Sequence, residues 1–182
     1  TSATMDGTSA VYSGLVSGDT LTGTYSGVFD NANVGTGKTV TITSSYGGTD
    51  VNNYTITDQA STTADISAKA LTATASVSNK TYDATNTATA TLTLSGLVGS
   101  ETLSTTNTST FNNKNVGTGK TVTVNSITLA DGTGLAANYS ISPGQTTTAD
   151  VTAKSLTVSG ITASNKTVSY THLTLPTIRL GV

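Results

Sequence analysis

The sequence predicts an all-β protein built from tandem β-sandwich modules, and three features carry that prediction: side-chain branching, periodicity and turn spacing. The β-branched residues Thr, Val and Ile number 65 of 182, and the chain has a single Glu. Branching at Cβ restricts χ1 and suits a pleated strand better than a helical turn. Apolar and small polar residues also alternate, as in Leu71–Val77, and a period of two indicates a half-buried strand.

Residues 70–154 contain a full set of predicted strands. Each is a short run bounded by Gly, Asn, Asp or Pro, which favour turns. In order, the expected strands are Leu71–Val77, Thr87–Leu94, Glu101–Thr105, Lys120–Asn125, Ser126–Leu129, Asn138–Ser142 and Thr147–Thr152. This number of short strands in about 85 residues is typical of an immunoglobulin-like sandwich. A β-grasp-like or other β-rich module is the alternative.

Three segments recur along the chain. The first two return after 82 residues and the third after 85: Asn33–Thr41 as Asn115–Thr123, Gly14–Leu21 as Gly96–Leu103, and Thr63–Lys69 as Thr148–Lys154. Such a period exceeds the roughly 20–50 residues of a solenoid repeat, whose units need their neighbours to bury a face. We therefore expect each copy to be a separate module.

The repeats divide the chain into successive parts. We expect residues 1–69 to be a copy truncated at its N-terminus, residues 70–154 a complete copy, and residues 155–167 the start of a third. In this alignment Met5-Asp6-Gly7 takes the place of Tyr82-Asp83-Ala84.

Residues 168–182 break the repeat. Their sequence resembles the translated adapter that ends some metagenomic reading frames, so we interpret them as a non-native tail; an atypical capping strand is the alternative. His172 and Arg179, the only His and Arg of the chain, lie there and support no catalytic site.

Composition excludes several classes of function. Only 10% of residues are charged and the net charge is −2, so the chain lacks the basic surface that nucleic acids and anionic membranes attract. Without Cys there is no disulfide framework, thiolate metal site or cysteine nucleophile. No apolar run reaches the roughly 18 residues of a bilayer span. We also expect no signal peptide at the N-terminus.

Candidate catalytic motifs fail on spacing or on repetition. Gly35-Thr-Gly-Lys-Thr39 ends like a phosphate-binding loop, but Ala32 replaces the required first glycine and an alternating strand follows, so we predict a hairpin turn. Between copies Asp30 becomes Asn112 and Asp19 becomes Glu101, so no pair of acids for glycoside hydrolysis is repeated. A Lys–Asn isopeptide cross-link would need a buried acid. We predict no catalytic, cofactor-binding or metal-binding residues, no cofactor and no enzymatic activity.

The order of motifs resembles the YDG repeat of large bacterial surface proteins. The similar segments are Ser78–Thr85, Gly96–Gly99, Phe111–Val122, Asn138-Tyr139 and Thr148–Lys154. The family is named for a Tyr-Asp-Gly turn, which here is Tyr82-Asp83-Ala84. The resemblance implies a filamentous-haemagglutinin-type adhesin exported to the Gram-negative cell surface, with such modules in tandem and no catalytic residues.

We therefore expect a structural stalk whose partners are adjacent repeats of the same chain. The alternative is an adhesive module that binds glycans or proteins on a host or bacterial surface. Tyr54 and Tyr139 are the candidate ligand contacts, since an exposed aromatic ring stacks on a sugar. A buried Tyr with its hydroxyl hydrogen-bonded is the competing interpretation of both residues.

Overall fold

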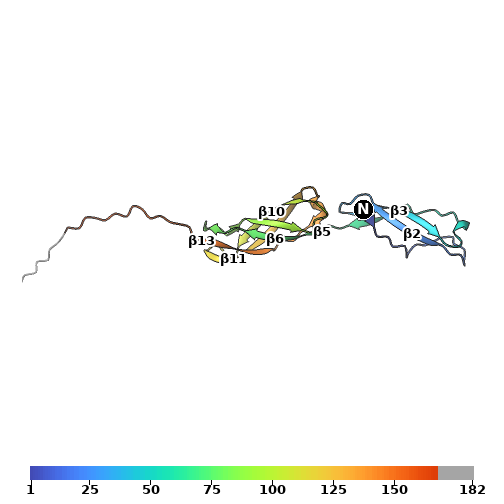
Figure 1. The fold of residues 1–182 in the computed structure, drawn as a ribbon, viewed down its shortest axis with the longest axis horizontal. Helices are drawn as coiled ribbons and strands as arrows, with labels where there is room; N and C mark the ends of the chain where they lie inside the picture. The colour runs from blue at the N-terminus through green and yellow to red at the C-terminus, as the bar shows by residue number, and fades with distance from the viewer. Residues whose placement is uncertain (168–182) are drawn as a thin grey trace, which may run out of the picture.

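The computed structural model describes residues 1–167, which form two β modules in succession followed by an extended segment (Figure 1). The described helical residues are two single 3-10 turns, η1 Val51–Asn53 and η2 Ala136–Asn138. The prediction of an all-β chain is confirmed. The predicted non-native tail, residues 168–182, lies outside the described residues.

The first module is one antiparallel sheet with strand order β1-β2-β3-β4. Its strands are β1 Ser2–Ala3, β2 Thr22–Phe29, β3 Gly35–Gly47 and β4 Ser61–Ile66. Strands β2 and β3 form a hairpin, because Phe29 pairs with Val40 next to the turn and Thr22 pairs with Gly47 at the far end.

The second module has two layers. A five-stranded sheet, β7-β13-β11-β10-β8, packs against the antiparallel pair β6–β9, and β5 pairs in parallel with β12. The strands are β5 Lys69–Ala70, β6 Thr72–Val77, β7 Lys80–Thr81, β8 Thr87–Ala88, β9 Ala90–Ser95, β10 Leu103–Phe111, β11 Gly117–Asp131, β12 Tyr139–Ser140 and β13 Thr146–Thr152. This arrangement is consistent with a β-sandwich.

Several strand boundaries differ from the sequence prediction. The strands expected at Lys120–Asn125 and Ser126–Leu129 are one long strand, β11, with a bulge at Asn125. Thr108 pairs with Ser126 and Ser109 with Val124, which leaves Asn125 unpaired. A bulge keeps a strand continuous while it shifts the alternation by one residue. Asn138 ends the η2 turn instead of beginning a strand.

The core of the second module is small. It consists of Phe111, Val122, Ala149 and Val151, with Val77, Tyr82 and Ala88 packed against it. Burial alternates along β11, since Val122 and Val124 are fully buried while Thr121 is exposed. The predicted period of two is confirmed in this strand.

The two modules differ in how this core is covered. In the second module β6 pairs with β9 and contacts β13 over the core. The described part of the first module contains no counterpart of β6, and Ala10–Ser13, which aligns with the end of β9, forms no strand. Phe29, the counterpart of Phe111, is therefore only half-buried.

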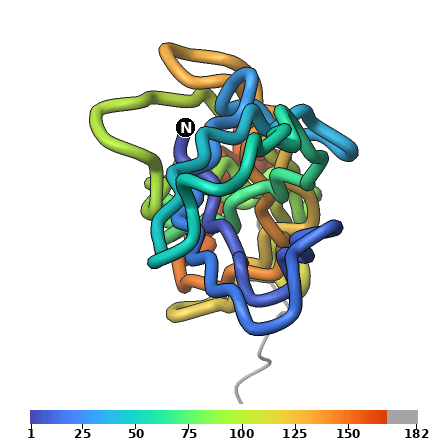
Figure 2. The backbone as a smooth tube through the Cα atoms, turned by 90° about the vertical axis from the view of Figure 1, so that its right-hand side faces the viewer, coloured from blue at the N-terminus to red at the C-terminus, as the bar shows by residue number. Residues whose placement is uncertain are grey.

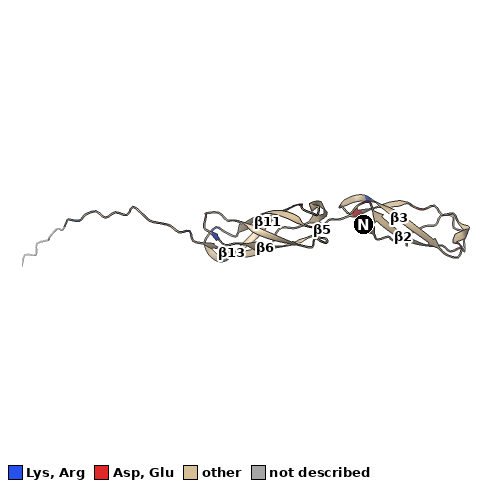
Figure 3. Ribbon diagram, turned by 45° about the horizontal axis from the view of Figure 1, so that its top comes forward, with Lys and Arg blue, Asp and Glu red and all other residues tan. Residues whose placement is uncertain are grey.

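In a view along the long axis of the molecule, the first module lies in front of the second (Figure 2), so the two modules follow one another along this axis. All strand pairs lie within one module or the other, and only Ser67 and Ala68 separate β4 from β5. Figure 3 shows that charged residues are sparse on both ribbons. The described residues include no helix long and apolar enough to cross a membrane.

Candidate functional site

The Gly-Thr-Gly-Lys loops lie at corresponding ends of the two modules, where each hairpin turns into its second strand. Gly37 and Gly119 have φ of +60° and +57°, a left-handed conformation that favours glycine. The Gly37 N–H donates to Asp65 Oδ1 at 2.8 Å, and the Gly119 N–H donates to Asp150 Oδ1 at 2.7 Å. The predicted hairpin is confirmed, but its turn is residues 30–34, and Gly35–Lys38 is the bulged start of β3. The acid repeated in both copies accepts the N–H of the second glycine in this bulge.

The lysines of these loops contact amides. Lys38 Nζ donates to Asn31 Oδ1 at 2.8 Å and lies 3.0 Å from Asp30 Oδ1. Lys120 is only 8% exposed, and its Nζ donates to Asn113 Oδ1 and to the Asn115 carbonyl oxygen.

A Lys–Asn cross-link would require an acid that protonates the Asn amide nitrogen, which leaves as ammonia when the lysine amine attacks the side-chain carbonyl carbon. The hydrogen bond from Lys38 holds the pKa of Asp30 below its usual range, so this carboxyl stays ionised at neutral pH. Asn112 occupies the same place in the second module. The geometry therefore brings Lys and Asn together without a protonated acid, and both lysines organise their loops.

Tyr54 and Tyr139 play the same role in the two modules. The Tyr54 hydroxyl donates to Asp19 Oδ2 at 2.7 Å and accepts the Val16 N–H at 3.0 Å. The Tyr139 hydroxyl donates to the Glu101 carboxylate and accepts the Val98 N–H at 3.1 Å. Donation to a carboxylate raises the pKa of both tyrosines.

These contacts tie a loop to the 3-10 turn that precedes each Tyr. Tyr139 is 7% exposed and offers no open ring face to a sugar, whereas Tyr54 is half-buried. A carboxylate accepts the tyrosine hydroxyl in both modules, although Asp19 of the first module is replaced by Glu101 in the second. The pairing could have been found in the sequence, since each copy has one acid after Gly-Leu-Val and one Asn-Tyr pair.

A groove of about 760 Å³ runs along the first module, and tyrosines line it. The hydroxyls of Tyr12 and Tyr25 are 3.0 Å apart, and Tyr46 packs edge-on against both rings at centroid distances of 6.3 and 6.4 Å. The hydrogen bond to Tyr12 raises the pKa of Tyr25 to about 12. In the second module β6 covers the equivalent face.

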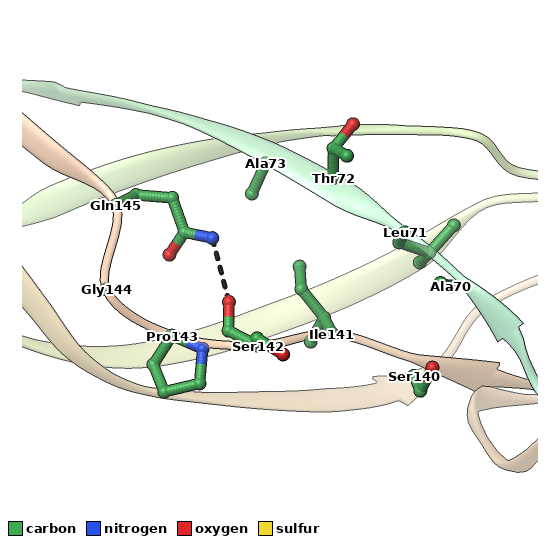
Figure 4. A pocket seen from close by; sticks show the side chains of 10 residues that line it. All are labelled: Ala70, Leu71, Thr72, Ala73, Ser140, Ile141, Ser142, Pro143, Gly144 and Gln145. Atoms are coloured by element: carbon green, nitrogen blue, oxygen red, sulfur yellow. Dashed lines mark hydrogen bonds between the residues drawn. The ribbon is translucent and has the colours of Figure 1, made fainter.

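The second module has a smaller hollow of about 450 Å³ between the start of β6 and the chain after β12 (Figure 4). Leu71 and Ile141 contribute its apolar surface, and Gln145 Nε2 donates to the Ser142 carbonyl oxygen at 2.8 Å. Its lining has no acid, Lys or His. Across residues 1–167, no three acidic or His side chains come together to hold a metal ion.

The protein-family model described as "YDG domain" matches this chain twice, over residues 1–64 and residues 67–149. The chain belongs to the YDG domain family. Comparisons with curated proteins and with solved structures find no match.

The turn for which YDG domains are named has an unusual backbone here. Asp83 Oδ1 accepts the Thr85 N–H at 2.9 Å and lies 2.8 Å from Lys80 Nζ. Its hydrogen bond from Lys80 is the main reason that the pKa of Asp83 falls to about 2. Ala84 has φ of +69° and is the one non-glycine residue with positive φ in the described chain. A glycine at this position of the YDG turn would adopt that φ without strain.

The alignment of Met5-Asp6-Gly7 with the YDG turn is wrong. Ser2 and Ala3 pair with Val28 and Gly27, just as Thr87 and Ala88 pair with Thr110 and Ser109. Thr1–Ala3 therefore corresponds to residues 86–88, which follow the turn. The misalignment has a physical source: the Thr8 N–H donates to Asp6 as the Thr85 N–H donates to Asp83, so the two turns share one local motif.

Proposed function

We propose that this pair of YDG modules is a non-catalytic spacer in a large secreted bacterial surface adhesin, where it holds a distal binding domain away from the cell. The end-to-end succession of the two modules carries this proposal (Figure 1). The strands of each module pair only with strands of the same module, and Ser67 and Ala68 connect β4 of the first module to β5 of the second. Adding a module therefore adds length without changing the strand pairing of the modules already present.

The side chains that could have supplied chemistry act instead as structural ties. Asp65 and Asp150 hold glycine amides, Asp19 and Glu101 hold tyrosine hydroxyls, and the loop lysines hold asparagine amides. A chain without Cys also folds outside the cell without an oxidation step. The extracellular, outer-membrane-associated setting follows from the resemblance to adhesin repeats.

The spacer function is tested by displaying a binding domain on a bacterial surface through zero, one or two copies of residues 1–154. The proposal predicts that the reach of the domain, measured by force spectroscopy as the contact distance from the cell, grows with each added copy. A reach independent of copy number would contradict it.

The alternative, an adhesive module that binds a surface glycan, is not favoured by the groove on the first module, because Tyr12, Tyr25 and Tyr46 line a face that β6 covers in the second module. A glycan array probed with the full chain tests this alternative. Binding that is lost in Tyr46→Ser and kept in Tyr139→Phe would support it, and silence of the array would leave the spacer as the better account.

A further inference from the structure

The two modules are joined by more than their linker, because Asn138 of the second module contacts a loop of the first. The Val34 N–H donates to Asn138 Oδ1 at 2.9 Å, and Asn138 Nδ2 donates to Asn33 Oδ1 at 3.0 Å. The side-chain amide therefore satisfies one donor and one acceptor of the loop at the same time.

The second module carries its own copy of this loop with the same internal structure. The Asn33 N–H donates to Asn31 Oδ1, and the Asn115 N–H donates to Asn113 Oδ1, both at 3.0 Å. In each loop a lysine ammonium contacts the same amide oxygen. The second loop is thus already folded in the form that accepts Asn138 in the first.

The loop is also fixed in the same place relative to the outgoing linker. Gly35 pairs with Ile66 in the first module, and Gly117 pairs with Val151 in the second. Ser67-Ala68-Lys69 follows Ile66, and Thr152-Ala153-Lys154 follows Val151. On the other side of the junction, Tyr139 pairs with Lys69, which places Asn138 next to the linker.

Exposure differs between the joined and the unjoined copies. Val34 is 37% exposed and Val116 is 55% exposed. Asn138 is half-buried at the junction, whereas Asn53, its counterpart in the first module, is exposed.

We propose that the Asn115–Val116 loop is a docking surface for a following copy of the YDG module. The incoming module binds through the Asn at the position of Asn138, and Asn53 is the residue with which the first module docks on a copy before it. The inference deepens the proposed spacer function, since a repeated contact would make a row of modules stiff. Failure of the contact would still allow a flexible spacer.

The test extends the chain by one module. Residues 1–154 are followed directly by a second copy of residues 70–154, so that the Lys154–Ala70 bond reproduces the Lys69–Ala70 bond of the native junction. Amide exchange and chemical shift of Val116 are measured by NMR in this chain and in the native one, with Val34 as the internal reference.

The proposal predicts that exchange of the Val116 amide slows about fivefold in the extended chain, as one net hydrogen bond of ordinary strength requires. Asn138→Ala in the added copy alone should return Val116 to its native-chain rate and leave Val34 unchanged. An amide of Val116 that is the same in the native and extended chains would overturn the proposal. A change of Val116 that persists in the Asn138→Ala chain would also overturn it, because the contact would then not run through this Asn.

Discussion

Replacing Ala84 by glycine should stabilise the second module. The φ of Ala84, +69°, lies in the left-handed region, which costs an L-residue about 1–2 kcal/mol. Glycine removes that cost but gives the unfolded chain more freedom, which offsets about 0.4–1 kcal/mol. The difference spans about 0–1.6 kcal/mol, and its central value of about 0.8 kcal/mol raises Tm by about 3–6 °C for a module of this size.

The assay is urea denaturation of the full chain, followed through the amide resonance of Val122 so that the second module is observed by itself. Ala130→Gly is the matched control, because Ala130 is exposed, lies near the end of β11 and pairs with Ser104 in a regular part of the β10–β11 ladder. That change should lower the free energy of unfolding by about 0.5–1 kcal/mol. If Ala84→Gly lowers it as well, the argument from backbone strain fails.

Three further predictions concern burial, charge and loop support. Phe111→Ala should cost about 3–5 kcal/mol, because the ring is 2% exposed, while Phe29→Ala should cost about 1–2 kcal/mol; equal losses in chemical denaturation would contradict the difference in cover. Asp83 has its pKa lowered from 3.8 to about 2, so its contribution is complete above pH 3.8 and disappears as the pH falls toward 2. Asp83→Asn should therefore flatten the acid limb of the Tm–pH curve, and an unchanged limb would refute this. Asp150→Ala should speed exchange of the Gly119 amide and lower stability by about 1 kcal/mol; unaltered exchange would show that the carboxylate does not hold this loop.

Local pattern was enough to predict most of the strands. The alternation in residues 71–77 and 147–152 is confirmed by β6 and β13, since burial on one face of a sheet imposes a period of two. The pattern failed at Asn125, because a bulge shifts the alternation and then resembles the start of a new strand. It also missed β5 and β7, whose two residues each are too few to show a period.

The contacts between distant residues were harder to predict. The hydrogen bonds of Asn138 to Asn33 and Val34 depend on the orientation of the second module relative to the first. No local sequence pattern predicts that orientation. The replacement of Asp19 by Glu101 means that this acid is not repeated unchanged between the two copies. In the structure both carboxylates accept a tyrosine hydroxyl, because Glu and Asp differ by one methylene and a loop absorbs it.

The position of Ala84 shows what a family likeness adds. Ala84 departs from the Tyr-Asp-Gly pattern, and the structure gives the departure a definite physical cost at one φ angle. Met5-Asp6-Gly7 shows the opposite case, since the same local hydrogen bond occurs at a different place in the fold.

The proposal that the two β modules form a stiff spacer is tested most directly by the distribution of distances between them. The chain has no Cys, so Ser26→Cys and Thr106→Cys place one exposed spin label on β2 and one on β10. Double electron–electron resonance should give a single narrow peak that broadens in Asn138→Ala. A broad distribution in the chain with Asn138 intact would show that the junction between the modules is flexible, and this result would contradict a stiff spacer.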